Sequence, residues 1–295
     1  IFLFIFLYCY SVLRTVEIIK KKFNTIIGVI LILSSSSMLI IERGNTDMLI
    51  FSLIFFSALN INFYKSIIFL FMAMSLKVYP LIAFIINFKN KKFFYLILAA
   101  MLICFFSFIN EINYFFSNAS SFEYTGYVYG FGPISKGILK SLDRLNLDLL
   151  IVFLGNSILI YIILVIITLS FIIIFFFKNL NQRYNINLNL INDRLLFAGS
   201  SIYCLSFIFF SSYDYRLIFL IFTIPHFFEK LTKLNLIYLG SVFLCLNSLI
   251  LFSIASSPID FLYIGTAIHF LKFIVFLFLI YELTKFLNFF YFRII

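Results

Sequence analysis

Long apolar runs, separated by short polar segments, dominate the pattern of hydrophobic and polar residues. Apolar runs of about 18 residues or more are typical of membrane-spanning helices, and only helices and closed barrels satisfy the backbone in lipid. The runs lack the alternation with period two that barrel strands show. We therefore predict an all-α, polytopic helical membrane bundle with about nine or ten membrane segments. The predicted segments are 1–13, 25–41, 48–63, 66–87, 93–109, 149–177, 195–212, 217–228, 236–254 and 261–282.

The composition agrees with this class. The chain is 64% hydrophobic and 12% charged, whereas globular domains are about 45–50% apolar and about 25% charged. We find no linker and no internal repeat, so 1–295 is predicted to be a single integral membrane domain with an outer loop at 110–148. The net charge of +10 comes from residues spread over short loops rather than one stripe, which argues against a nucleic-acid partner.

The first apolar run, Ile1–Leu13, is short for a membrane span. It gives about 20 Å of helix, while the hydrocarbon core is about 30 Å thick. It has neither a charged n-region nor a small-residue cleavage site, so it does not resemble a signal peptide. We expect an upstream part of the protein before Ile1.

The run 66–87 decides how the chain threads the membrane. The basic segment Lys20–Lys22 marks the cytoplasmic side, because lysine and arginine concentrate there. If the run crosses once, the basic segment Lys89–Lys92 lies outside. If it turns back at Lys77–Pro80, this segment and most other basic residues lie inside. Since Pro80 also breaks helices, we predict a broken helical hairpin at 66–87 whose tip points toward the outer side.

Charged residues on the predicted outer side are the candidates for chemistry. Arginine presents a planar fork that matches phosphate oxygens, so Arg43 and Arg216 are candidate phosphate ligands. The carboxylates of Glu42, Asp47 and Asp214 are candidates for a general base or for binding a hydroxyl group, and their spacing selects none of them. The alternative is that these are interfacial charges or local ion pairs, which contribute little stability.

Two further features lie close to these charges. Asn45, Thr46 or Asp47 can cap a helix that opens at Met48, whose N-terminal amides favour an anion. Lys77 lies next to the predicted helix break. It can contact a lipid phosphate, neutralise a carboxylate, or extend to the outer surface as an ordinary snorkelling lysine.

Other polar and aromatic residues leave several interpretations open. Lys272 and His269 share a face of the span 261–282, either as a functional site or as a structural polar contact. His226, near the inner surface, is predicted to be a satisfied or surface histidine. The aromatic residues of the 110–148 loop suit either sugar stacking or, as we favour, the headgroup belt; they are Tyr124, Tyr127, Tyr129 and Phe131.

The cysteines lie in apolar runs without CxxC spacing, so we predict buried thiols and neither a disulfide nor a metal site; they are Cys9, Cys104, Cys204 and Cys245. The sequence has no Gly-rich phosphate loop, no HExxH and no nucleophile elbow. These absences weigh against ATP-driven transport and against nucleotide-sugar chemistry on a cytosolic domain. We predict no cofactor.

Three motifs resemble a known superfamily. Glu42–Asp47 (ERGNTD) opening a helix, Leu76–Pro80 (LKVYP) and the basic Lys89–Lys92 (KNKK) are similar to the GT-C membrane glycosyltransferases, most of all to glycosyltransferase family 87. Tyr213–Phe219 (YDYRLIF) resembles an element of related members. The resemblance implies transfer of a mannose-like hexose from a polyprenyl-phosphate donor to a glycan or lipid acceptor, usually with inversion. The reaction would take place on the non-cytoplasmic face of a bacterial inner membrane.

The resemblance also implies roles for particular residues. Arg43 and Lys77 would bind the donor phosphate or hold the shape of the site, Arg216 is a weaker phosphate candidate, and Asp47 would recognise a hydroxyl group. Asn45 and Tyr79 complete the predicted substrate-binding set. The family's essential acidic residue lies in the first outer loop, which here would precede Ile1, so no catalytic acid is assigned. The implied partners are membrane lipids, the polyprenyl-phosphate sugar and the acceptor.

Two other functions remain open. A transporter or a flippase for a lipid-linked or small polar substrate fits the broken helices and the intramembrane Lys272 with His269. Transporters place polar residues near the midplane, whereas most of the polar residues here are predicted at the outer edge. An O-antigen-polymerase-like or ligase enzyme would share the long outer loop and the outer arginines.

Overall fold

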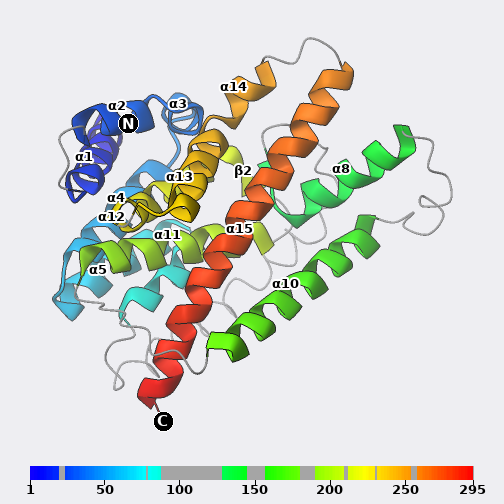
Figure 1. Cartoon of the computed structure of the whole chain (residues 1–295). Helices are drawn as coiled ribbons and strands as arrows, with labels where there is room; N and C mark the ends of the chain where they lie inside the picture. Colours follow the sequence, from blue (N-terminus) through cyan, green and yellow to red (C-terminus); the bar gives the residue numbers. More distant parts are fainter. Residues whose placement is uncertain are drawn as a thin grey trace.

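The computed structural model describes residues 1–19, 24–77, 79–87, 128–144, 157–179, 190–208, 212–229, 231–253 and 258–294, and every structural statement below concerns these ranges. The described chain is helical, apart from one pair of two-residue strands (Figure 1). The helices of the first half are α1 (Phe2–Glu17), α2 (Asn24–Ile32), α3 (Ser35–Glu42), α4 (Asp47–Leu59), α5 (Phe63–Leu76) and the 3₁₀-helix η1 (Tyr79–Asn87). The later elements are β1 (Val128–Tyr129), α8 (Phe131–Arg144), α10 (Ser157–Asn179), α11 (Ile191–Ile208), β2 (Ser212–Tyr213), the 3₁₀-helix η3 (Asp214–Thr223), α12 (Ile224–Glu229), α13 (Lys233–Leu246), α14 (Ser248–Ser253) and α15 (Pro258–Ile294).

Two described helices are long and apolar enough to cross a membrane. They contain the segments Leu159–Lys178 of α10, with 20 residues, and Ile264–Asn288 of α15, with 25 residues. Helices α2 and α3, bent by 55°, would make a third span if they cross together. Only 17% of the α10 window is buried, so this very apolar helix presents its side chains to the surroundings. Such a surface suits lipid rather than water.

Several predicted segments are broken in the structure. The segment 25–41 is divided between α2 and α3, because the hydroxyls of Ser34 and Ser37 both donate to the carbonyl of Leu31, at 2.7 and 2.8 Å. Serine side chains that compete for backbone carbonyls in this way bend helices. The segment 236–254 is likewise divided, at Asn247, into α13 and α14. The segment 217–228 consists of η3 and α12, and 93–109 lies outside the described residues.

The hairpin predicted at 66–87 turns back on itself in the structure. Helix α5 ends at Leu76, and Lys77 adopts an extended conformation with φ −155° and ψ 155°. The ring of Phe71, before the break, packs against that of Phe84, after it, with centroids 5.2 Å apart. Helix η1 therefore runs back along α5, and the chain reverses where the lysine and proline predicted it.

Helix α11 packs against both 3₁₀-helices, η1 and η3. At Gly199 the approach to η3 is very close. A Cβ atom there would lie 2.5 Å from the carbonyl oxygen of Phe219 and 2.9 Å from the Cβ of Phe222. Only glycine fits this contact without a shift, so Gly199 sets the spacing between α11 and η3.

The described part of the predicted outer loop 110–148 is folded. Strand β1 pairs with β2, and α8 packs on α10 and α15. Tyr129 and Phe131 are buried rather than lying in a headgroup belt. The reason is helical spacing: Phe131, Ile134 and Ile138 line one face of α8, which the core covers. Residues 110–127, with Tyr124 and Tyr127, lie outside the described part.

Candidate functional site

The ERGNTD motif forms a tight reversal between α3 and α4. Gly44 has a φ of +56°, which glycine adopts far more readily than other residues. The Gly44 N–H donates to the carbonyl of Ile41 at 3.1 Å, and the Asn45 N–H donates to that of Ile40 at 3.3 Å. These two bonds form a Schellman motif, which satisfies the last carbonyls of α3. The motif therefore turns the chain directly into α4.

Asn45 then supports the start of the next helix, α4. Its Oδ1 accepts a hydrogen bond from the backbone N–H of Asp47 at 3.1 Å. Among the three candidates, Thr46 occupies the N-cap position without a side-chain bond, Asn45 supplies the side-chain bond, and Asp47 is the first residue of α4. The start of α4 is thus fixed by one side chain, and the Asp47 carboxylate projects from its first turn.

The Asp47 carboxylate is completely buried and joins three segments that are far apart in the sequence. Its Oδ1 accepts hydrogen bonds from Lys77 Nζ at 2.6 Å and from the Tyr79 hydroxyl at 2.8 Å. Its Oδ2 lies 3.8 Å from Arg216 Nε. Lys77 Nζ also donates to Asn45 Oδ1 at 3.0 Å. We call Asn45, Asp47, Lys77, Tyr79 and Arg216 the Asp47 cluster.

Aromatic rings hold the two cations of the Asp47 cluster. The Arg216 guanidinium lies 4.9 Å from the centroid of the Tyr79 ring. The Tyr215 ring lies 5.9 Å from Lys77 Nζ and 5.9 Å from the Arg216 guanidinium carbon. Cations over aromatic faces are stabilised by about 0.5–2 kcal/mol. Tyr215 is a contact that sequence reasoning missed, although its place next to Arg216 was a usable signal.

The charge balance and exposure of the cluster favour an anionic ligand. Among the described residues, the cluster combines one carboxylate with two cations. The side chains of Lys77 and Arg216 are 27% and 24% exposed, while that of Asp47 is not exposed at all. The carboxylate therefore holds the cations from the buried side, and the cations reach the surface. This arrangement suits binding of a phosphate-like group.

The sequence proposed eight catalytic or substrate-binding candidates: Glu42, Arg43, Asn45, Asp47, Lys77, Tyr79, Asp214 and Arg216. The structure brings five of them together, and these five form the Asp47 cluster. Glu42 is exposed at the last position of α3, and Arg43 is exposed at its C-cap. The two cations that form ion pairs with Asp47 are Lys77 and Arg216. The sequence had ranked Arg43 above Arg216 as a phosphate ligand, and the geometry favours Arg216.

Asp214 is buried inside the protein and is not part of the Asp47 cluster. Its carboxylate is buried against α15, with its two oxygens 2.7 and 2.8 Å from Lys272 Nζ. The Ser248 hydroxyl donates to Asp214 Oδ2 at 2.7 Å. A lysine inside an apolar helix requires such a partner, because burying an unpaired charge is costly. Nothing in the spacing of Asp214 and Lys272 along the sequence identified the pair.

The surroundings of Lys272 are aromatic. Lys272 Nζ lies 6.0 Å from the centroid of the Tyr129 ring, and the Tyr203 hydroxyl donates to the Lys272 carbonyl at 2.8 Å. His269, one turn earlier on α15, is buried, with its ring beside that of Phe252 at 6.5 Å. Strand β1 and α11 thus enclose the Asp214–Lys272 pair.

A third set of polar residues lies at the start of α11. His226 Nδ1 lies 3.1 Å from Asp193 Oδ1, which confirms the satisfied histidine predicted at this position. Arg194 donates to the carbonyl of Ser57 and to the hydroxyl of Ser66, each at 2.9 Å. These bonds join α11 to the end of α4 and the start of α5, at the opposite ends of both helices from Asp47 and Lys77.

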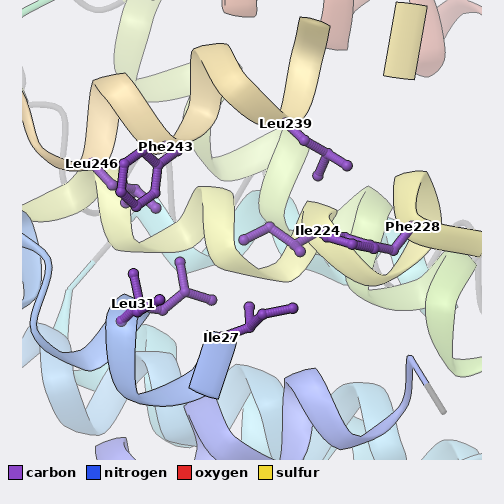
Figure 2. Close-up of a pocket in the computed structure, with 8 residues that line it drawn as sticks. Ile27, Leu31, Ile224, Phe228, Leu239, Phe243 and Leu246 are labelled. Atoms are coloured by element: carbon purple, nitrogen blue, oxygen red, sulfur yellow. The ribbon is translucent and has the colours of Figure 1, made fainter. Parts of the chain in front are cut away.

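Neither the described cysteines nor the apolar pocket in Figure 2 provides a further polar site. Cys204 and Cys245 are buried free thiols and Cys9 is half-buried, whereas Cys104 lies outside the described residues. In the described ranges, no group of three or more His, Cys, Asp or Glu side chains is arranged to hold a metal ion. The pocket in Figure 2, between α2, α12 and α13, is lined by apolar side chains alone: Ile27, Ile30, Leu31, Ile224, Phe228, Leu239, Phe243 and Leu246.

Comparison of the chain with protein families, with curated proteins and with solved structures finds no match in any of the three.

Proposed function

We propose that this protein is a membrane-embedded, GT-C-like glycosyltransferase. It transfers a mannose-like hexose from a polyprenyl-phosphate donor to a glycan or lipid acceptor on the non-cytoplasmic face of a bacterial inner membrane. The observation that carries the proposal is the Asp47 cluster, in which a buried carboxylate holds Lys77 and Arg216 beside a break in an apolar hairpin.

The cluster has the charges that a phosphate leaving group needs. In sugar transfer from a lipid phosphate, the bond between the sugar and the phosphate breaks and negative charge grows on the phosphate. Cationic donors held in fixed positions stabilise that charge. Lys77 and Arg216 are held by Asp47 and by the rings of Tyr79 and Tyr215, so their donors need little reorganisation on binding.

Asp47 acts by holding the cations. Its Oδ1 already accepts two hydrogen bonds, from Lys77 and Tyr79. Its Oδ2 makes no hydrogen bond in the described part of the chain and lies beside Arg216. Because this oxygen is buried, we propose that Asp47 acts on the substrate through Lys77 and Arg216 rather than by direct contact.

The course of the chain supports a multi-pass arrangement. The break at Lys77 interrupts an apolar segment, and backbone that is not helical at membrane depth must face protein or water. Helices α10 and α15 lie side by side (Figure 1), and their C-terminal parts are joined by Asn288 Nδ2 donating to the carbonyl of Phe176 at 3.1 Å. The two helices are therefore parallel, as the proposed threading requires.

A second candidate function, a transporter or flippase for a lipid-linked or polar substrate, is favoured by one observation. The buried Asp214–Lys272 pair lies inside the candidate span Ile264–Asn288. Charged pairs within membrane segments are typical of substrate and ion pathways. The Asp47 cluster is the more exposed of the two charged sites, so the enzyme remains our proposal.

Sugar transfer in membranes that contain the full-length protein tests the proposal. Labelled mannose on polyprenyl phosphate is the donor, and transfer to endogenous acceptors is measured. We expect kcat/KM to fall at least tenfold in Lys77→Ala and in Arg216→Ala, since a lost charge-assisted hydrogen bond costs about 1.5–3 kcal/mol. The matched controls Lys65→Ala and Arg14→Ala, both at exposed positions, should retain wild-type transfer.

Unchanged transfer in both cluster variants would contradict the proposal. Loss of substrate uptake into vesicles on Lys272→Ala, in a protein without sugar transfer, would favour the transporter instead.

A further inference from the structure

The fold ties the Asp47 cluster to the Asp214–Lys272 pair through one short element, η3. Asp214 is the first residue of η3, and Arg216 follows two positions later. In a 3₁₀-helix, which has three residues per turn, side chains two positions apart project about 120° apart. One side of η3 is therefore fixed to α15, while the other presents Arg216 to Asp47.

This attachment of η3 is highly specific. Lys272 Nζ is completely buried and bonded to both oxygens of Asp214, and Ser248 adds a third bond to that carboxylate. If η3 moved by one residue, Asp214 would leave Lys272 and a buried charge would lose its partner, which is strongly unfavourable. The pair therefore fixes the position of the first turn of η3 relative to α15.

Helix η3 depends on such contacts. It has ten residues, whereas 3₁₀-helices longer than three or four residues are uncommon because their hydrogen-bond geometry is poorer. Its N-terminal side is held by the pairing of β2 with β1, and its middle by the close contact at Gly199. Along the chain, Asp214 lies between these two attachments and two residues before Arg216.

We propose that Asp214 and Lys272 are positioning residues for phosphate binding. They hold the start of η3 so that the Arg216 guanidinium lies beside Asp47 and reaches the phosphate of the ligand. The pair does not touch the ligand. This inference rests on the proposed function, because it assumes that Arg216 binds a phosphate.

Coupling between the pair and Arg216 distinguishes positioning from general support of the fold. Residues that act only through Arg216 have no further effect once Arg216 is removed. A pair that merely stabilises the protein weakens binding to the same extent with or without Arg216. The double variant Asp214→Asn/Lys272→Met is used because it removes both charges and leaves neither one buried alone.

The experiment measures the Kd of farnesyl phosphate for the purified full-length chain in nanodiscs. Farnesol, which has the same tail without the phosphate, is the reference ligand. We expect Arg216→Ala to raise the Kd for farnesyl phosphate at least tenfold and to leave that for farnesol unchanged. The double variant should raise it to a similar extent, and combining it with Arg216→Ala should add less than twofold. The control Asp193→Asn/His226→Gln, a polar pair at the other end of α11, should bind farnesyl phosphate as the wild type does.

A second variant keeps the test decisive if the double variant does not yield folded protein by gel filtration. Ser248→Ala removes one hydrogen bond to Asp214 and keeps both charges. It should weaken farnesyl phosphate binding two- to fivefold, and this loss should disappear when Arg216→Ala is also present.

The outcomes separate the two proposals. If the wild type does not prefer farnesyl phosphate to farnesol, or if Arg216→Ala binds it normally, the proposed function fails. If Arg216→Ala weakens binding but the double variant and Ser248→Ala bind normally, or if their losses multiply with that of Arg216→Ala, the positioning proposal alone is overturned.

Discussion

The close packing of η3 against α11 at Gly199 offers a sharp test of how η3 is placed. Gly199→Ala puts a methyl group 2.5 Å from the carbonyl oxygen of Phe219 and 2.9 Å from the Cβ of Phe222. Both contacts are shorter than van der Waals distance, and one is to backbone, which cannot rotate away. The two helices must therefore separate by several tenths of an ångström.

The size of the effect follows from two opposing terms. Overpacking a core position costs about 1–3 kcal/mol. Replacing glycine by alanine inside a helix returns about 0.5–1 kcal/mol. The net expectation for Gly199→Ala is a loss of about 1–2 kcal/mol. Gly240 is the matched control, because a Cβ there meets nothing within 4 Å. Gly240→Ala should stabilise the protein by about 0.5–1 kcal/mol.

Thermal unfolding in detergent, followed by loss of the monodisperse gel-filtration peak, measures both variants against the wild type. The Tm should fall for Gly199→Ala and rise for Gly240→Ala. Because η3 also carries Arg216, Gly199→Ala should weaken farnesyl phosphate binding as well. If both alanine variants raise the Tm equally, α11 and η3 do not approach each other at Gly199, and the placement of Arg216 is wrong.

Three further predictions concern the individual contacts. Gly44→Ala should destabilise the folded protein by about 1–2 kcal/mol, because the positive φ of Gly44 disfavours a side chain. Chemical denaturation measures this loss, and an unchanged midpoint would contradict the Schellman turn. Tyr79→Phe removes one hydrogen bond to Asp47 and should cost about 1 kcal/mol in the same assay, whereas the exposed control Tyr64→Phe should cost nothing measurable. Lys272→Met alone should lower stability by about 3–5 kcal/mol, because it leaves the Asp214 charge buried without its partner. Asp214→Asn/Lys272→Met should cost less, and a double variant less stable than the single variant would contradict the presence of a buried ion pair.

Sequence reasoning predicted the elements that have local signals. Asn45, Thr46 and Asp47 predicted the start of a helix, and in the structure Asn45 bonds the backbone N–H of Asp47, the first residue of α4. Lys77 and Pro80 predicted the reversal between α5 and η1. These features depend on residues close together in the sequence, whose backbone preferences can be inferred without knowledge of the fold.

The contacts between distant segments were harder to predict. Asp214 and Arg216 are two residues apart and were both placed on the outer side, but η3 directs one to Lys272 and the other to Asp47. The folded helix α8 was missed, because the glycines and polar residues around it resemble a loop. Its burial against α10 and α15 depends on tertiary packing, which hydropathy does not encode.

The proposed reaction requires the Asp47 cluster to face the non-cytoplasmic side of the membrane. One measurement decides this: labelling of single cysteines in intact cells with a membrane-impermeant maleimide, using Thr46→Cys and Lys65→Cys, both at exposed positions. The account predicts that Thr46→Cys is labelled from outside the cell and that Lys65→Cys is labelled only after the membrane is opened. Labelling of Thr46→Cys only from the cytoplasm would contradict the proposed function, because a polyprenyl-phosphate sugar would then not meet Lys77 and Arg216 on the outer face.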